Sequence, residues 1–408
     1  MNCRLSGLVI PLLVAVLTLP WLHSGQALAQ PVPKWSGSFK SLNIASEKDP
    51  TETIPEAQVS SNRFRLEMGW ALNRYLRLEA ALDHQLLWAN PADLLDLSTG
   101  GVNRHLDLET TWQHSDSWRS RLQLDHFNLR LTLDNLDAVI GRQAIGFGRI
   151  VIFSPLDIIA PFPPDALDTD VRPGIDAIQV STYYGLDGRF GGTFVWGDEQ
   201  RHNSWLLTWS DNRGGVDLLA IGGRLRERPM LGVGLAGSLG TLGLKAEAAF
   251  YEGQRTDELS GDLHKTFTIG ALEAWYRFDN GLTLVSQYLY NGAGADSPEE
   301  YPAVAASASL QEGLTALLGR NYLLAAPSYE LHPLATLQGL LIWNLDDDSL
   351  LARPSLILEP WDNISLELFF TLHSGDSPSQ LSPLPLFTPR SEFGLRGNSG
   401  GLFLTCYF

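Results

Sequence analysis

Most of the chain alternates between apolar and polar residues with a period of two, a pattern typical of β-strands rather than of helices. The alternation is clear over residues 63–70, 76–83, 242–250 and 364–373. In a strand the two sets of side chains lie on opposite faces of the sheet. The pattern therefore predicts a protein built mainly from strands that bury one face.

Three further features favour a membrane barrel over a soluble sandwich. Many alternating stretches run for about ten residues, as a membrane-crossing strand requires, whereas soluble strands average about five or six. Tryptophan and tyrosine recur near the expected strand ends, as in the interfacial girdles of membrane barrels. The chain ends in alternating Leu402, Leu404, Cys406 and Phe408. This ending resembles the terminal strand signature that the bacterial barrel-assembly machinery reads. We predict an all-β, transmembrane, antiparallel up-and-down barrel, with membrane lipid and, through Phe408, the assembly machinery as partners.

Tight turns and longer loops alternate along the sequence, and their number sets the number of strands. Tight turns with Asn, Asp or Gly are expected near 72–74, 134–135, 186–188, 212–214, 240–241, 279–281, 332–333 and 362–363. Outer loops are expected near 45–60, 89–118, 148–173, 253–263, 292–319 and 374–396, with short links near 198–201, 227–228 and 346–348. Because such barrels have an even strand count and short periplasmic turns, these connections predict about 18 strands, with 16 as the alternative. Residues 103–114 are assigned to an outer loop, because another strand would break the even count.

The N-terminus has the composition of an export signal. Arg4 precedes an apolar run from Leu8 to Leu22, and residues 27–29 (Ala-Leu-Ala) offer the small residues that a signal peptidase reads. We predict a signal peptide over residues 1–29 and an outer-membrane barrel over residues 30–408. An uncleaved membrane helix is the alternative for the first segment.

The acidic composition limits the partners that the chain can have. The formal net charge is −17, and binding phosphates needs clustered Lys and Arg, so no nucleic-acid partner is expected. We predict no metal, no cofactor and no catalytic residue, since the sequence lacks the G-x-S-x-G and H-E-x-x-H motifs. Gly232-x-Gly234-x-x-Gly237 matches the spacing of a dinucleotide fingerprint. It lies in a strand-like run without a following helix, so we do not assign it that role.

The most informative segment is a strand that leads into a long, Pro-rich and charged loop and then returns. It begins as GRQAIGFGR at residues 141–149, passes through SPLD at 154–157 and returns as RPGIDA at 172–177. A structureless loop of about 25 residues is usually functional or disordered, and its apolar residues argue against disorder. We predict that it folds into the barrel mouth and sets the pore width and field; a surface cap of paired charges is the alternative. The expected constriction and loop residues are Arg142, Gln143, Arg149, Asp157, Asp168, Asp170, Arg172 and Asp176.

This segment resembles the alginate export family and related Gram-negative porin-like proteins. The likeness covers residues 136–180 and lies in the GRQ-x-I-x-x-G-R strand, the S-P-x-D loop and the returning R-P-G-x-D-A. It implies a barrel of about 18 strands and a charged channel for an anionic or other hydrophilic solute. Polyanion channels of that family have a basic lumen, whereas this chain is acidic overall.

Strand parity also predicts which side chains line the lumen. If Phe408 and its partners face lipid, the opposite face carries seven basic and six acidic residues. Charged side chains at membrane depth are tolerated only where they face water or protein, so these positions indicate a polar interior. A lumen plugged by Arg–Glu pairs is the alternative. The predicted lumen-facing residues are Arg63, Arg65, Glu67, Arg77, Glu79, Asp83, Arg130, Lys245, Glu247, Glu273, Arg277, Arg353 and Glu367.

These features together predict a non-enzymatic outer-membrane channel. Its function would be the diffusion or export of small hydrophilic solutes, including anionic ones, or of a polysaccharide. Two alternatives come from other classes. One is a barrel hydrolase acting on lipid or surface polymer, because a catalytic triad assembled in space leaves no local motif. The other is a barrel scaffold around a periplasmic partner.

Overall fold

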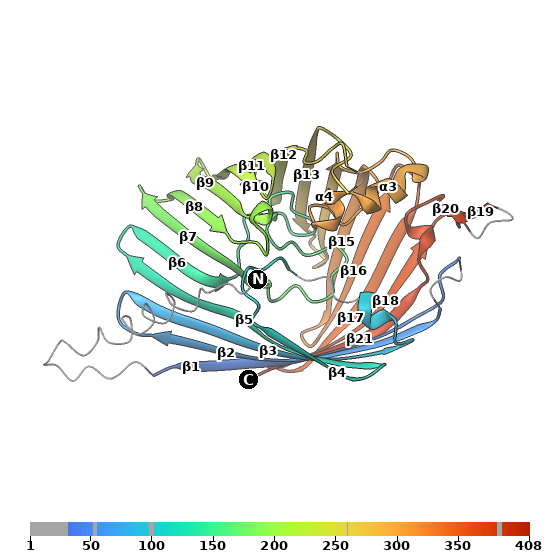
Figure 1. The fold of residues 1–408 in the computed structure, drawn as a ribbon, viewed down its shortest axis with the longest axis horizontal. Coiled ribbons are helices and arrows are strands. Elements are labelled where there is room, and N and C mark those ends of the chain that lie inside the picture. Colours follow the sequence, from blue (N-terminus) through green and yellow to red (C-terminus); the bar gives the residue numbers. More distant parts are fainter. Residues whose placement is uncertain (1–31, 52–54, 98–101, 259, 382–385) are drawn as a thin grey trace, which may run out of the picture.

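The structure, a computed structural model, describes residues 32–408 except 52–54, 98–101, 259 and 382–385, and its strands form one closed wall (Figure 1). The predicted signal peptide, residues 1–29, lies outside the described residues. The wall closes because β1 (Lys34–Ser46) pairs with β2 (Ala57–Ala71) on one side and with the last strand, β21 (Ser399–Tyr407), on the other. All strand pairs in the wall are antiparallel. The prediction of an up-and-down barrel of 18 strands is confirmed.

The remaining wall strands follow in chain order. They are β3 (Leu76–Asn90), β5 (Trp118–Leu133), β6 (Leu136–Gln143), β7 (Ile175–Tyr184), β8 (Gly188–Val195), β9 (Ser204–Arg213), β10 (Val216–Leu225), β11 (Arg228–Leu239), β12 (Leu242–Glu252), β13 (Thr266–Arg277), β14 (Thr283–Asn291), β15 (Asn321–His332), β16 (Ala335–Asn344), β17 (Leu350–Trp361) and β18 (Ile364–Ser374). The loops carry small elements: α2 (Leu94–Leu97), η2 (Gln200–His202), η3 (Pro298–Glu300), α3 (Tyr301–Ala306), α4 (Ala308–Gln311), β19 (Ser379–Leu381), β20 (Leu386–Thr388) and η4 (Phe393–Leu395). No helix in the described ranges is long and apolar enough to cross a membrane.

Short turns gather at one end of the barrel and longer connections at the other. The strand ends place the turns at 72–75, 134–135, 185–187, 214–215, 240–241, 278–282, 333–334 and 362–363, which are the predicted positions to within a residue or two. Gly214 and Gly240 have positive φ angles of 62° and 61°, which glycine adopts without steric cost. The turn residues therefore fix the strand count, as the alternation of turns and loops predicted.

The expectation that residues 103–114 contain no strand was wrong. Strand β4 (Glu109–Ser115) pairs with the outer half of β5, from Glu109 opposite Gln123 to Ser115 opposite Trp118. On the same edge, β6 pairs only with the inner half of β5 and ends at Gln143. Strand β4 thus occupies the part of the wall that β6 leaves open when the chain turns inward, and the even count of full-length strands is preserved.

Most wall strands expose an apolar face toward the outside and turn a different face toward the lumen. On β11, Leu231 and Leu235 are 54% and 50% exposed, whereas Met230 is buried. Gly232 and Gly234 of the same strand lie below Leu156; a Cβ at Gly232 would come within 2.6 Å of its side chain. The glycines of the supposed dinucleotide motif therefore leave room for the segment that fills the lumen.

The lumen has two unlike halves. Residues 144–174 run through the interior (Figure 1) and pack with the inward faces of β7 to β17 into one apolar core. The segment contributes Ile145, Ile150, Phe153, Leu156, Ile158, Ile159 and Ala160 to this core. The inward faces of β1, β2, β3 and β5 instead carry buried polar and charged side chains: Ser38, Lys40, Arg65, Asp83, Gln123, Asp125 and Asn128. We call residues 144–174 the lumen loop.

Candidate functional site

The root of the lumen loop is a buried ion pair between two adjacent strands. Arg142 on β6 and Asp176 on β7 are register partners, and they are 2% and 4% exposed. The Arg142 Nε and Nη2 atoms donate to the two Asp176 carboxylate oxygens at 2.9 and 3.0 Å. Arg142 also donates to the carbonyl of Leu106 at 2.5 Å, and Asp176 accepts the Leu106 N–H at 2.8 Å. This pair therefore clamps residue 106 of the preceding loop onto the wall.

Gln143 is also buried at this root. Its Nε2 donates to the carbonyls of Val139 and Ala177 at 3.2 and 3.0 Å. The pair of Arg142 and Asp176, like Gln143, thus has its polar groups bound to neighbouring chain segments. Arg142, Gln143 and Asp176 therefore lie together at the root of the lumen loop and anchor it. All three are buried, so none of them faces solvent in the lumen.

The first part of the lumen loop is pinned by polar side chains from three consecutive strands. Glu247 on β12 accepts the Arg149 and Ile150 N–H groups at 2.5 and 3.2 Å, and the Ser154 hydroxyl at 2.5 Å. Glu273 on β13 accepts the Val151 N–H at 2.6 Å. Gln287 on β14 accepts the Phe153 N–H at 3.1 Å and donates to its carbonyl at 2.7 Å. A loop backbone without its own ladder needs such partners when it is buried.

The far edge of the lumen loop reaches the opposite wall. Asp168 and Asp170 accept hydrogen bonds from Lys40 Nζ on β1 at 2.6 and 2.8 Å, and Tyr407 on β21 donates to Asp170 at 2.7 Å. On β17, Arg353 donates to the Asp165 carbonyl at 2.7 Å. Strands β1 and β12 lie nearly opposite one another in the ring of wall strands. Contacts to both strands place the lumen loop across the lumen.

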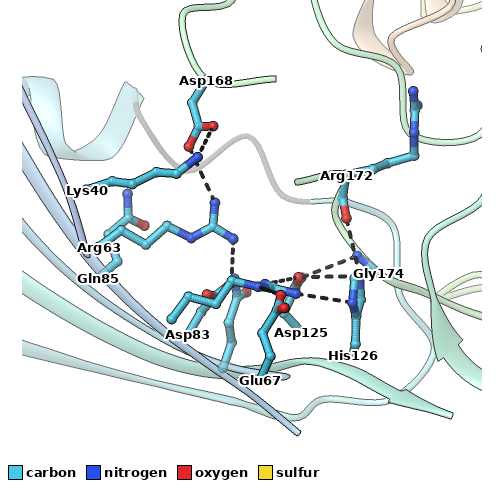
Figure 2. Close-up of polar contacts among 12 residues, drawn as sticks. Lys40, Arg63, Glu67, Asp83, Gln85, Asp125, His126, Asp168, Arg172 and Gly174 are labelled. Atoms are coloured by element: carbon cyan, nitrogen blue, oxygen red, sulfur yellow. Dashed lines mark hydrogen bonds and ion pairs between the residues drawn. The ribbon is translucent and has the colours of Figure 1, made fainter. Parts of the chain in front are cut away.

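Between the loop edge and the wall lies a chain of alternating charges (Figure 2). Arg63 contacts Asp83 at 2.5 Å and Asp168 at 3.8 Å. Arg65 then joins Asp83 at 2.9 Å to Asp125 at 2.7 Å, and it also contacts Glu67 at 2.5 Å. Charge-assisted hydrogen bonds of this kind fix side-chain positions more firmly than neutral ones. The polar half of the lumen therefore has an ordered lining.

A cavity of about 770 Å³ opens beside this charge chain, between the inner wall of β2, β3 and β5 and residues 102–109. Arg104 lines this cavity and donates to Gln123 at 2.9 Å and to Asp125 at 2.6 Å. Arg121 also lines it and donates to Gln85 at 3.0 Å. Within the described part of the chain, Arg121 has no carboxylate partner, and its Nε lacks a hydrogen bond. This guanidinium is thus a cation of the cavity wall without a carboxylate partner in the part of the chain that the structure describes.

The other predicted loop charges pair locally. Arg172 donates to Asp157 at 2.5 Å and to the Ala160 carbonyl at 2.9 Å. Burial raises the pKa of the Asp157 carboxyl above its ordinary value, although Arg172 opposes the shift. Arg149 lies 3.5 Å from Asp217 of β10. These pairs shape the lumen loop itself.

The remaining predicted lumen residues do not form one cluster. Lys245 pairs with Glu273 at 2.8 Å, and Arg77 pairs with Glu79 at 3.0 Å near the turn end of the barrel. Glu367 on β18 shares the inward parity of Phe369, which is buried. Arg130 and Arg277 make no side-chain hydrogen bond or ion pair with the described residues.

Sequence reasoning missed Lys40, Arg104, Arg121 and Asp125. A signal for two of them was present, because Arg119, Arg121, Gln123 and Asp125 alternate with Ser120, Leu122 and Leu124. Lys40 sits on a strand of small polar residues, where alternation is weak. Arg104 comes from an outer loop, and no periodicity could have placed it beside the barrel wall.

The fold is that of Gram-negative outer-membrane porins. Pseudomonas aeruginosa OccK11 (OpdR) superposes with a TM-score of 0.55 and 9% identity over 95% of this chain and 99% of that one. For P. aeruginosa OccK9 (OpdG) the TM-score is 0.55 at 12% identity, over 92% and 98% of the two chains. Acinetobacter baumannii OccAB2 gives 0.55 at 8%, over 92% and 98%. No protein-family model matches the sequence, and a sequence search among characterised proteins finds no match. The resemblance to the alginate export family therefore stays a prediction.

Proposed function

We propose that this protein is a channel of the bacterial outer membrane that passes small hydrophilic solutes by diffusion. The observation that carries the proposal is the division of the lumen. The lumen loop fills the half lined by β7 to β17 with an apolar core. The half lined by β1 to β5 keeps ordered charges and a cavity of about 770 Å³. Polar groups at membrane depth need water or protein partners, and a hydrated passage supplies the water.

The outer surface supports the membrane location. Large apolar side chains are exposed on the outward positions of successive strands, among them Leu207, Leu231, Phe250 and Leu272. Short turns at one end and long loops at the other match the arrangement of outer-membrane barrels, in which the turns are periplasmic. The chain would thus present its outer loops, the lumen loop and the cavity to solutes arriving from outside.

The cavity is lined by five arginines (Arg63, Arg104, Arg119, Arg121 and Arg142) and five carboxylates (Asp83, Asp107, Glu109, Asp125 and Asp198). An anion preference would therefore come from the position of individual cations and not from the net charge of the lining. Lys40, Arg63, Gln85 and Arg121 form one lateral row across four strands, because each is the register partner of the next. In this row Lys40 and Arg63 have carboxylate neighbours and Arg121 has none among the described residues. A fixed cation beside a narrow aqueous path raises the local anion concentration. We therefore assign anion preference to Arg121 before the paired residues.

The resemblance to the alginate export family would extend the solute to a polysaccharide. A polymer would have to thread between the loop edge and β1, where Lys40 bridges to Asp168 and Asp170. A small solute fits the cavity of about 770 Å³ beside this edge without such an opening. The small-solute function is therefore the proposal that the geometry supports better.

Conductance in planar bilayers tests the proposal. Wild-type protein should open ion-conducting events, and Arg121→Ala should lower the anion-to-cation permeability ratio about threefold to fivefold. This magnitude follows because a unit charge about 4 Å away in water contributes about 1 kcal/mol. Arg121→Lys should retain most of the preference. Arg213→Ala is the matched control, because Arg213 is 71% exposed beside a short turn and pairs with Asp211.

Two results would overturn the proposal at different levels. Folded wild-type protein that never conducts would remove the channel function. Conductance with the same permeability ratio in Arg121→Ala and wild type would leave a channel whose path does not follow β2 to β5. Lipid hydrolysis by a non-conducting barrel would instead favour the hydrolase alternative.

A further inference from the structure

The wall closes at a pair of strands that no turn or loop of the chain joins. Every other neighbouring pair in the wall is linked by such a connection, whereas β1 and β21 are the first and last strands of the chain. Their register runs from Ser38 opposite Tyr407 to Ser46 opposite Ser399. A short connection keeps two strands close when their hydrogen bonds open, and this pair lacks one. We call the pair of β1 and β21 the closing seam.

The backbone hydrogen bonds show which groups face the closing seam. Gly37 and Phe408 exchange both of their N–H···O bonds, at 2.9 and 3.0 Å. Hydrogen-bonded pairs alternate along an antiparallel ladder. The N–H groups of odd-numbered β1 residues therefore face β21, and those of even-numbered residues face β2. On β21, the Tyr407 N–H donates to the carbonyl of Asn363, on the side of β18.

The edge of the lumen loop binds both strands of the closing seam from the inside. The Asp170 Oδ2 atom accepts from Lys40 Nζ on β1 at 2.8 Å and from the Tyr407 hydroxyl on β21 at 2.7 Å. Asp168 accepts a second bond from Lys40 at 2.6 Å and lies 3.8 Å from Arg63 on β2 (Figure 2). One short segment of the loop thus contacts three successive strands of the wall, on both sides of the seam.

Burial makes the contact with β1 costly to break. Lys40 is 3% exposed, and a buried ammonium group needs carboxylate partners. Its Nζ also lies 5.9 Å from the centre of the Phe403 ring on β21. The Asp170 side chain is half exposed, so solvent screens its bonds in part and each contributes at the lower end of the range for charged groups.

The rest of the lumen loop is fixed to the other half of the barrel. Residues between 145 and 160 pack into the apolar core with β7 to β17. Arg353 on β17 donates to the Asp165 carbonyl at 2.7 Å, and Asp170 follows five residues later. Opening of the closing seam would therefore move Lys40 or Tyr407 away from a carboxylate that the anchored loop holds in place.

We infer that Asp170, together with Asp168, is a clasp that holds the closing seam shut and sets how readily the wall opens there. Asp170 can bind Lys40 and Tyr407 at the same time only when β1 and β21 are neighbours. The clasp therefore forms together with the closed wall, and it strengthens the pair of strands that the chain itself does not connect. The inference does not rest on the channel proposal, because it concerns the wall and not the solute.

Residue-resolved hydrogen exchange of the full-length protein in detergent micelles tests the inference. Asp170→Ala removes both arms of the clasp and leaves Asp168 as the partner of Lys40, so the buried ammonium keeps a carboxylate. Exchange of the odd-numbered β1 amides, which bind β21, should rise about tenfold to 100-fold. The even-numbered β1 amides, which bind β2, should keep their wild-type rates. Tyr407→Phe removes one arm and should give a rise of about threefold to tenfold.

Asp217→Ala is the matched control. Asp217 on β10 lies 3.5 Å from Arg149 of the lumen loop, and its side chain is half exposed like that of Asp170. The change thus removes an ion pair between loop and wall away from the closing seam, and it should leave exchange of the β1 amides unchanged.

A covalent seam provides a second control. Phe39 and Cys406 are register partners. Cα atoms of hydrogen-bonded partners lie about 5.5 Å apart, a separation that a disulfide can span. In a variant that combines Phe39→Cys with Asp170→Ala, the oxidised protein should exchange at wild-type rates at the odd-numbered β1 amides. The reduced protein should show the same rise as Asp170→Ala.

Three results would overturn the inference. The first is unchanged exchange of the odd-numbered β1 amides in Asp170→Ala. The second is an equal rise at odd-numbered and even-numbered amides, which would mean that the change loosens the wall as a whole. The third is an equal rise in Asp217→Ala. If Asp170→Ala fails to fold, Tyr407→Phe, which keeps the aromatic ring, decides the question at the same amides.

Discussion

The pins of the lumen loop lead to a prediction with a calculable magnitude. Glu247 is 4% exposed and accepts three hydrogen bonds from the loop. Bonds to a charged group contribute about 1.5–3 kcal/mol each, so their sum is about 5–9 kcal/mol. Glu273, Gln287 and the apolar contacts remain when Glu247 is changed, and contributions of neighbours are not additive. We expect Glu247→Ala to weaken docking of the loop by about 3–4 kcal/mol.

Glu247→Gln should have a smaller effect. The amide oxygen can still accept the Arg149 and Ile150 N–H groups, and the Ser154 hydroxyl can rotate to accept from the amide nitrogen. What is lost is the charge, so we expect about 1–2 kcal/mol. A larger loss of docking free energy in Glu247→Ala than in Glu247→Gln indicates that Glu247 acts through hydrogen bonds. If it acted through its charge alone, the two variants would lose the same free energy.

Native-state hydrogen exchange of the lumen loop measures these effects. Since about 1.4 kcal/mol is a factor of ten, exchange at residues 149–151 should rise about 100-fold to 1,000-fold in Glu247→Ala and about tenfold in Glu247→Gln. Glu79→Gln removes a lumen-side carboxylate that contacts Arg77 instead of the loop, and it should leave exchange at wild-type rates. Unchanged exchange in Glu247→Ala would refute the role of β12 in holding the loop.

Two further predictions concern the charges at the loop edge and at the outer rim. Asp168→Asn with Asp170→Asn removes the partners of Lys40, so the reversal potential in a salt gradient should move toward anion preference; movement toward cations would contradict this account. Burial raises the pKa of Glu392 above its ordinary value of 4.5, against the hydrogen bond from Tyr322. The contribution of Glu392 to stability is therefore complete below pH 4.5 and is lost as the pH rises through the raised value. The Leu318 N–H donates to Glu392 at 2.9 Å. Between pH 4.5 and 8, its hydrogen-exchange rate in wild type should rise more steeply than the rate of an unprotected amide. In Glu392→Gln the two rates should rise in parallel.

The fold was predictable because its signals are local. The alternation around residues 63–70 and 242–250 and the turns at Asn73 and Gly240 each need only a few neighbouring residues. Strand β4 shows the limit of such reasoning. Its sequence alternates like a strand, but it pairs with β5 only because β6 leaves the wall early, and that event lies more than twenty residues further along the chain.

The surroundings of the candidate site residues could not be predicted from the sequence. The Pro-rich segment crosses the lumen (Figure 1). The sequence predicted that Arg142, Gln143 and Asp176 line the pore, whereas in the structure they are buried at the root of the loop. Arg142 is buried because residue 106, from an earlier loop, covers it. Lys40 contacts Asp168 across 128 positions, and no local pattern specifies that pairing. Which charges are neutralised depends on such long-range contacts, so the role of each constriction residue stays a prediction.

The apolar core inside the lumen has a consequence for how the protein assembles. On β10, for example, Leu219 and Ile221 face the lumen core while Val216 is exposed on the opposite face. Before the barrel closes, both the lumen-facing and the lipid-facing surface of this half of the sheet are apolar and exposed to water. In a strand with a polar lumen face, only the lipid-facing surface is apolar. Such surfaces aggregate unless they are covered. The lumen loop covers the inner surface, so we expect a chain with a displaced loop to aggregate more readily during folding.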